Sequence, residues 1–439
     1  MFKFEAILTL AAIVAAMAWQ SAPASAADVE SLQLRAWGRN ESSQLGTGTS
    51  DSTYNLPQQV SSLGLGVTVV AAGGENAYAI QNGTLYAWGY NYYGLLGLGN
   101  TTNYDTPQAV TALGNDVRAV TASSLNAMAI VGDSRTLYVW GANNYGQLGN
   151  GSYDSSYGVA HSTPATVQLN GAPMTGVTAI ASSSSGANLA VVGGTLYGWG
   201  YAGMRQLGDP DTIGASTITG GTRLMYHPAI VPGMESGVTA IAMGSNFSMA
   251  IQNGKVYTWG DNEQGQLGNG SKNTASDPYI VTPTQVLPVG DGVRAIAAGP
   301  NTALAVDAEG TVWGWGLGLT PTPTELFPDT LTNIVEVAVM MSNSPYTTFF
   351  ALDAEGDLYA WGSNCFGELG LGLDAGYYYD ATYKLFPNVN TTEPQLIGTG
   401  YTSISVGSNF VLATWVPEPA SLGLLALGGV AMMFRRRKH

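Results

Sequence analysis

Cysteine and histidine are scarce in this 439-residue chain, which limits the chemistry it can support. Cys365 is the only cysteine, so no disulfide can form within the chain. The histidines, His161, His227 and His439, are far apart in sequence. A zinc site needs several such ligands at close spacing. The sequence therefore predicts neither an internal disulfide nor a metal site, and we expect no cofactor.

Recognisable catalytic motifs are also missing. The chain has no Gly-x-Ser-x-Gly nucleophile elbow and no phosphate-binding loop. Charged residues make up only 10% of the sequence, and the formal net charge is −15. An acidic protein repels nucleic acid and anionic membrane surfaces. We therefore predict a non-enzymatic protein that does not bind nucleic acid.

Glycine, by contrast, is abundant, with 58 residues, and a Trp-Gly pair recurs along the chain at steps of about 46 to 60 residues. The tryptophans of these pairs are Trp37, Trp88, Trp140, Trp199, Trp259, Trp315 and Trp361. Seven copies at such a period indicate a repeat architecture. Because the tryptophans recur at equivalent positions, we assign them to structure and not to ligand binding.

Each unit has the pattern of a small antiparallel sheet. Leu85 and Ala87 alternate with Tyr86 and Trp88, as in a strand, and both faces are apolar, so both should be covered. Asn-Gly at residues 82–83 predicts a tight hairpin before this strand. After it comes a turn of the form Asn-x-x-Gly-x-Leu-Gly, in which glycine permits a left-handed backbone.

This unit closely resembles the repeat of the regulator of chromosome condensation family, with its core Tyr-x-Trp-Gly-x-Asn-x-x-Gly-Gln-Leu-Gly. The resemblance covers about residues 28–415 and implies an all-β, seven-bladed β-propeller, with short helical segments only at the two termini. Some copies depart from the pattern. Ser43 and Arg205 replace the central glycine, Ala202 replaces the asparagine, and the unit at Trp315 lacks the Gly-Gln-Leu-Gly turn. We expect irregular blade geometry at that last unit.

The two ends of the repeat array complement each other. Residues 28–38 supply a Trp-Gly strand without the Val-rich strands that precede it elsewhere. Residues 402–414 supply those strands with no Trp-Gly strand after them. We therefore predict a single domain, residues 27–416, with one blade completed by both termini. Such closure removes the exposed sheet edges of the ring.

Residues 1–26 have the features of a secretory signal peptide. Lys3 precedes an apolar run at residues 6–19, and small residues follow, with an Ala-x-Ala cleavage site most simply after Ala26. A buried N-terminal helix is the alternative, which the run of small residues disfavours. The mature protein is expected to leave the cytosol.

The C-terminal tail, residues 417–439, has three parts. The motif Pro417-Glu418-Pro419 is followed by an apolar stretch at residues 420–434 and by the basic cluster Arg435, Arg436, Arg437 and Lys438. As a helix the apolar stretch would span roughly 22 Å, short for a hydrocarbon core of about 30 Å. A permanent membrane anchor is therefore the less favoured interpretation.

The tail resembles the PEP-CTERM sorting signal of Gram-negative bacteria. The resemblance implies transient inner-membrane contact through the C-terminal segment, then processing near Pro417-Glu418-Pro419 by an exosortase-type enzyme. It also implies a final location at the cell surface or in extracellular polymer.

Polar inserts rich in tyrosine lie between the units, at residues 153–161, 209–226, 270–279 and 373–383. We expect them on one face of the ring. Tyrosine is common in binding surfaces because it offers a large amphipathic side chain at low entropic cost. The candidate ligand-binding residues are Tyr153, Tyr157, Tyr377, Tyr378 and Tyr379. Local packing of the same side chains is an equally open alternative for any one insert.

Three classes of function remain. The leading hypothesis is a non-enzymatic exported protein that binds polysaccharide, or a surface or secreted protein, through its loops. The alternative is a secreted inhibitor, similar to bacterial propellers that cover β-lactamase active sites with aromatic loops. An enzyme is least supported, because no acid, base and nucleophile set is recognisable. Some eukaryotic members of the family bind chromatin and exchange nucleotide on a small GTPase, but export and acidic charge argue against both roles here.

Overall fold

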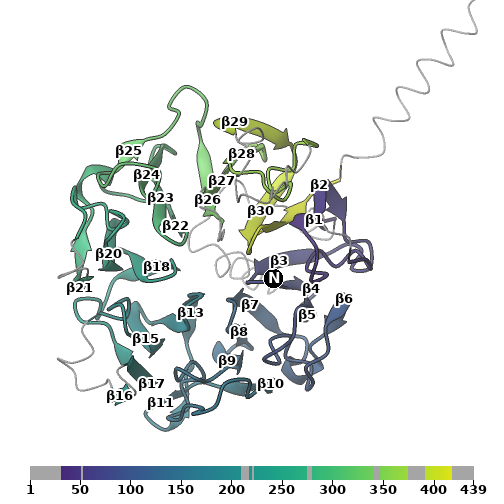
Figure 1. The fold of residues 1–439 in the computed structure, drawn as a ribbon, viewed down its shortest axis with the longest axis vertical. Coiled ribbons are helices and arrows are strands. Elements are labelled where there is room, and N and C mark those ends of the chain that lie inside the picture. The colour runs from purple at the N-terminus through teal and green to yellow at the C-terminus, as the bar shows by residue number, and fades with distance from the viewer. Residues whose placement is uncertain are drawn as a thin grey trace, which may run out of the picture.

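The computed structural model describes residues 31–50, 53–208, 217–219, 222–273, 279–340, 347–373 and 391–417. Seven antiparallel sheets surround a central axis and form a seven-bladed β-propeller (Figure 1). The predicted all-β class and blade number are confirmed. Within the described residues the helices are single 3-10 turns, η1 (Thr111–Leu113) and η2 (Leu287–Val289). The helical segments expected at the termini lie outside the described residues.

We number the blades 1 to 7 by their Trp-Gly pairs, and the strands of each blade 1 to 4 from the axis outward. In this order blade 1 consists of β30 (Tyr401–Val406), β31 (Phe410–Trp415), β1 (Gln33–Arg39) and β2 (Thr53–Gln59), and blade 2 of β3 (Val67–Ala72), β4 (Asn76–Gln81), β5 (Thr84–Gly89) and β6 (Tyr104–Ala109). Blade 3 consists of β7 (Val117–Ala122), β8 (Asn126–Val131), β9 (Thr136–Gly141) and β10 (His161–Thr166). Blade 4 consists of β13 (Val177–Ser182), β14 (Ala187–Val192), β15 (Thr195–Tyr201) and β17 (Thr222–Ile230).

The other three blades follow the same order. Blade 5 consists of β18 (Val238–Met243), β19 (Phe247–Gln252), β20 (Lys255–Asp261) and β21 (Tyr279–Gln285). Blade 6 consists of β22 (Ala295–Ala298), β23 (Thr302–Val306), β24 (Val312–Gly316) and β25 (Thr324–Glu325). Blade 7 consists of β26 (Ile334–Val339), β27 (Thr348–Asp353), β28 (Leu358–Gly362) and β29 (Thr391–Gly398). A fifth strand, β16 (Thr217–Thr219), extends blade 4, and β11 (Gln168–Leu169) pairs with β12 (Ala172–Pro173) beside blade 3.

Blade 1 is built from both ends of the chain, as predicted. In it β1 pairs antiparallel with β31, with Gln33 opposite Trp415 and Gly38 opposite Phe410. Figure 1 shows the purple N-terminal strands meeting the yellow C-terminal strands in this blade. The innermost strands of neighbouring blades contact one another around the whole ring, including β3 with β30 at the seam. The chain ends therefore close the ring.

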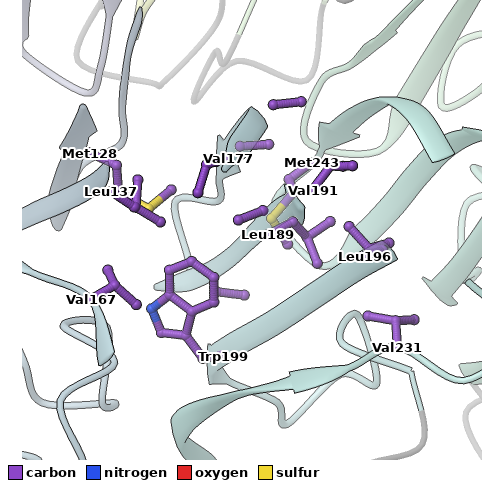
Figure 2. Close-up of a cluster of buried hydrophobic side chains, with 14 of the residues drawn as sticks. Met128, Leu137, Val167, Val177, Leu189, Val191, Leu196, Trp199, Val231 and Met243 are labelled. Atoms are coloured by element: carbon purple, nitrogen blue, oxygen red, sulfur yellow. The ribbon is translucent and has the colours of Figure 1, made fainter. Parts of the chain in front are cut away.

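The tryptophan of each Trp-Gly pair fills the space between its own blade and the preceding one. Trp199 of blade 4 packs in one apolar cluster with Met128, Leu137 and Val167 of blade 3 (Figure 2). Six of the seven tryptophans are fully buried, and Trp361 is 5% exposed. Burial of such large side chains supplies much of the apolar contact that holds neighbouring blades together.

The glycine of each pair is required by the backbone. Gly89 has φ of +91° and lies at a bulge in the pairing of β5 with β6. A Cβ there would lie 2.5 Å from the carbonyl oxygen of Glu75. The equivalent glycines of the other blades also have positive φ and meet a backbone carbonyl in the same way. Only glycine fits both constraints.

The turn after five of the seven pairs is fixed by its asparagine, and the turn ties one blade to the next. In blade 2 the amide N–H of Leu96 donates to Asn91 Oδ1 over 2.9 Å. The indole N–H of Trp88 donates to the carbonyl oxygen of Gln44, in the turn of blade 1, over 2.9 Å. The same indole bond is made by Trp37, Trp140, Trp199, Trp259 and Trp315.

The junction between blades 6 and 7 is the exception, and the predicted irregularity is confirmed. After Trp315 the chain lacks the turn, and the outer strand β25 has only two residues. The turn carbonyl that accepts the indole bond at the other junctions is therefore missing beside Trp361. Trp361 instead stacks on Phe349, with ring centroids 5.3 Å apart, and meets Phe327 edge-on at 5.7 Å.

In other units, residues that depart from the repeat sequence retain its backbone conformation. Ser43 and Arg205 both have φ of +61°, the conformation of the glycine that they replace. Glu368 replaces the usual glutamine in the turn of blade 7 and, like it, accepts a bond from the amide two residues earlier, that of Phe366. Its other carboxyl oxygen is buried and has no partner among the described residues. Burial raises the pKa of Glu368 to about 7.

Candidate functional site

The connections of the blades sort onto two faces of the ring. In an antiparallel blade, the loops that join strand 1 to strand 2 and strand 3 to strand 4 lie at one end of the strands. The hairpin that joins strand 2 to strand 3 and the connection from strand 4 to the next blade lie at the other end. All four tyrosine-rich inserts join strand 3 to strand 4. They therefore start and end on the same face, which we call the loop face.

Tyrosines of blade 2 begin a continuous aromatic surface on this face. Tyr90 stacks on Tyr92 with ring centroids 6.3 Å apart, and Tyr92 meets Tyr93 edge-on at 4.9 Å. The Tyr92 hydroxyl lies beside Gly158 in the insert of blade 3, 3.3 Å from where a Cβ of that residue would lie. The surface thus crosses from blade 2 to blade 3.

It continues through blades 3, 4 and 5. The hydroxyls of Tyr145 and Tyr157 are 3.4 Å apart, and the Tyr145 ring meets Tyr201 of blade 4 edge-on at 5.3 Å. Tyr279 of blade 5 donates a hydrogen bond to Met204 Sδ in the turn of blade 4 over 3.1 Å. We call this set the tyrosine surface: Tyr90, Tyr92, Tyr93, Tyr145, Tyr157, Tyr201 and Tyr279.

Three tyrosines of this surface, Tyr145, Tyr201 and Tyr279, have raised hydroxyl pKa values. The hydrogen bond with Tyr157, together with burial, raises the pKa of Tyr145 to about 12. Burial, and then the proximity of Tyr279, raises the pKa of Tyr201. Burial and the nearby carboxylates of Asp261 and Glu263 raise that of Tyr279. Burial and neighbouring groups therefore favour the protonated hydroxyl at these three tyrosines, which can both donate and accept hydrogen bonds.

The two predicted tyrosines of the blade 3 insert differ. Tyr157 is 76% exposed. Tyr153 stacks on Tyr226 of blade 4 with centroids 5.1 Å apart, and a bond of 2.9 Å between His161 Nε2 and Asp154 Oδ2 helps to hold the insert. Tyr153 thus has a packing partner, whereas Tyr157 is displayed. Their roles in binding stay predictions.

The sequence pattern missed most of the tyrosine surface. Tyr92, Tyr145 and Tyr201 lie in or beside the repeat turns, outside the predicted inserts, whereas Tyr279 is the last residue of the predicted insert 270–279. Tyr92, in one of the two variable positions after the turn asparagine, is 54% exposed. Aromatic residues in these variable positions were the signal that could have found this surface.

Several predicted residues lie outside the described part of the chain. These are Tyr377, Tyr378 and Tyr379 of the fourth insert, Glu418 and Pro419 of the sorting motif, and the basic residues Arg435, Arg436, Arg437 and Lys438. Pro417 is the last described residue.

Within the described ranges no group of three or more His, Cys, Asp or Glu side chains could hold a metal ion. None of the helices in these ranges has the length and apolarity that a bilayer crossing requires. Cys365 is half-buried in the turn of blade 7, where its sulfur lies 3.3 Å from Ser363 Oγ.

Known protein-family patterns match most of the chain. The regulator of chromosome condensation (RCC1) repeat matches residues 34–80, 82–130, 136–189, 193–251, 253–306 and 355–414, and a second description of the same repeat matches 238–266. The PEP-CTERM protein-sorting motif matches residues 416–438. The unmatched stretch 307–354 contains the irregular junction after Trp315.

Individual relatives share part of their length with this chain. The human E3 ubiquitin-protein ligase HERC2 is 31% identical over 279 residues, which cover 62% of this chain and 5% of that protein. The ultraviolet-B receptor UVR8 of Arabidopsis thaliana is 28% identical over 252 residues, 57% of this chain and 53% of that receptor. The chain thus spans less than two thirds of the length of either relative.

Solved structures share the fold. Prp20p from Saccharomyces cerevisiae superimposes with a TM-score of 0.72 at 20% identity, covering 92% of this chain and 95% of that one. Human WBSCR16 superimposes with a TM-score of 0.70 at 18% identity, covering 88% and 98%. At such identities the likeness concerns the fold alone.

Proposed function

This chain belongs to the regulator of chromosome condensation repeat family, and we propose that it is a non-enzymatic binding protein that engages extracellular polysaccharide through the loop face. The PEP-CTERM motif indicates export and membrane-associated sorting in a Gram-negative bacterium. Beyond what the motif indicates, we propose the class of ligand, the face that binds it, and a final location at the cell surface or in extracellular polymer.

The observation that carries the proposal is the tyrosine surface. Tyr92 and Tyr157 are exposed, and their neighbours in four successive blades hold them in a continuous layer of aromatic rings. Rings of this kind can stack on the C–H faces of sugar rings, and their hydroxyls can bond sugar hydroxyls. A repeating polymer matches a surface that extends across several blades.

The proposed processing follows from the sequence. Residues 1–26 are removed on export, residues 27–416 form the propeller, and an exosortase-type enzyme cuts near Pro417-Glu418-Pro419. Nucleotide exchange and nucleic-acid binding are not part of the proposal, because the protein is exported and acidic.

Affinity electrophoresis tests the polysaccharide role. The processed protein is run in native gels that contain extracellular polysaccharide purified from the producing bacterium, and in gels without it. We expect concentration-dependent retardation only in the first. Unchanged mobility at every polymer concentration would contradict the polysaccharide role.

A protein partner is the second candidate, because Tyr157 projects from the loop face as an inhibitor loop would. Capture of a purified β-lactamase by the processed protein, with loss of that enzyme's activity, would support the inhibitor role in place of polysaccharide binding.

A further inference from the structure

Both ends of the folded body leave the ring at the face opposite the loop face. In blade 1, β31 is strand 2 and β1 is strand 3, and Trp415 at the end of one lies opposite Gln33 at the start of the other. The other blades have their strand 2–3 hairpins at this position. We call this side of the ring the termini face.

The exit point of the C-terminal tail is fixed to the fold. The amide N–H of Val416 donates to the carbonyl oxygen of Gly400 over 2.8 Å. The indole N–H of Trp415 donates to the Thr399 carbonyl over 2.9 Å, and the Arg35 guanidinium lies 3.7 Å above the Trp415 ring. Such contacts on both sides of the strand end oppose fraying, so the tail departs from a defined place.

The tail leaves little free chain between the body and the membrane-directed segment. The apolar stretch begins at Ala420, four residues after Val416. At no more than about 3.6 Å per residue, this link spans at most about 14 Å. The blade strands alone are roughly 20 Å long at 3.3 Å per residue. The link is therefore too short to pass around the ring and let the body turn over.

We propose that, while the tail holds the protein at the inner membrane, the termini face lies toward the bilayer and the tyrosine surface points away from it. The loop face is thus open to ligand before the tail is cut. This inference rests on the membrane-retention part of the proposed function and is independent of which ligand binds.

The charge of the termini face determines whether this face can contact the bilayer surface. Exposed acids occupy its hairpins and connections, among them Asp116, Asp133, Asp291, Glu309, Asp329 and Glu355. Two of its basic side chains are paired with these acids, Arg118 with Asp133 and Lys255 with Asp291. Anionic lipid repels such a surface. The body therefore stands off the bilayer, and the processing enzyme acts within this narrow gap at Pro417-Glu418-Pro419.

Energy transfer to membrane lipid tests the orientation. Two conservative changes in blade 3, Ser134→Cys in the strand 2–3 hairpin and Ser156→Cys in the insert, place a thiol on exposed residues of opposite faces. Each is made in the full chain with Cys365→Ser, in a Gram-negative host without an exosortase-type enzyme.

The transfer is measured in spheroplasts, where a membrane-impermeant maleimide donor labels the thiol and an acceptor lipid labels the outer leaflet of the inner membrane. Because the sites differ in depth by the roughly 20 Å strand length, transfer should be about twofold or more higher from residue 134.

The outcomes separate the two parts of the argument. Equal transfer from both sites, or higher transfer from residue 156, contradicts the orientation while leaving membrane retention intact. Absence of transfer from both, with the chain in the soluble fraction, contradicts retention and the orientation together. As a control, a long Gly-Ser linker inserted between Val416 and Pro417 should remove the difference, because the link would no longer restrict the body.

Discussion

Trp88 and Tyr92 stand four residues apart in the same repeat unit, yet they belong to different layers of the molecule. Trp88 is fully buried against blade 1 and donates its indole N–H to Gln44. Tyr92 is 54% exposed and contacts the tyrosines beside it. The repeat thus specifies the residues that hold blades together and leaves the variable turn positions free for recognition. Changes in the first layer should affect stability, and changes in the second should affect binding.

The largest effect is expected at the seam of the ring. Deleting Tyr401–Trp415 removes β30 and β31, half of blade 1, leaves β1 paired only with β2, and takes from β3 its contacts with β30 and β31. We expect the single cooperative thermal transition of the intact protein to be lost. A truncated protein that melts as sharply as the full protein would contradict closure by both termini.

Replacing a buried tryptophan should come next. Trp88→Ala removes a side chain with no exposed surface and should cost roughly 3 to 5 kcal/mol of unfolding free energy. Urea unfolding measures it. Tyr92→Ser, the matched change in the other layer, should stay within about 0.5 kcal/mol. Equal costs for the two changes would remove the distinction between the layers.

The carboxyl group of Glu368, on the buried side of the blade 7 turn, gives a pH-dependent test. Its pKa is about 7 in the fold against 4.5 when unfolded. The unfolded carboxyl releases its proton first, so the folded state holds more protons between these values and loses stability as pH rises through them. Glu368→Gln should remove this loss and stabilise the protein by up to about 3 kcal/mol at pH 8, with little change near pH 4.

Thermal melts of both proteins across this pH range measure the difference. A constant offset between them, independent of pH, would show that the pKa of Glu368 is the same in the folded and unfolded states.

The two kinds of tryptophan junction provide a smaller contrast. Trp88→Phe leaves the Gln44 carbonyl without its donor, whereas the Trp361 junction lacks the turn that supplies such a carbonyl. We expect Trp88→Phe to cost about 1 kcal/mol more than Trp361→Phe in urea unfolding. The reverse order would mean that the indole bond adds nothing at regular junctions.

The fold could be predicted from sequence because its constraints recur. The Trp-Gly glycines need positive φ and close backbone approach in every blade, so the pattern repeats seven times. The incomplete units at the two ends likewise predicted a blade shared by both termini, and the pairing of β1 with β31 confirms it. Even the irregular blade was visible, because Leu317-Gly318-Leu319-Thr320 cannot supply the missing turn.

The site was less predictable because it depends on which turns become neighbours. Tyr145 meets Tyr201 across a blade boundary, although the two residues are 56 positions apart in sequence. The local sequence around either residue does not show which turn of the neighbouring blade it will contact. Tyr153 is partly predictable, since its place in an insert agrees with its 37% exposure, while its stacking on Tyr226 of the next blade could not be foreseen.

Binding by paired surface variants tests the central claim most directly. Tyr157→Ser changes the loop face, and Leu287→Ser changes a residue of equal exposure, 75% against 76%, on the termini face. Both variants should melt within a few degrees of the unmodified protein, because neither side chain is buried. In affinity electrophoresis with polysaccharide from the producing bacterium, Tyr157→Ser, combined with Tyr92→Ser, should lose most of its retardation while Leu287→Ser keeps it. Full retardation of the double tyrosine variant, or loss of retardation in Leu287→Ser, would contradict recognition by the tyrosine surface.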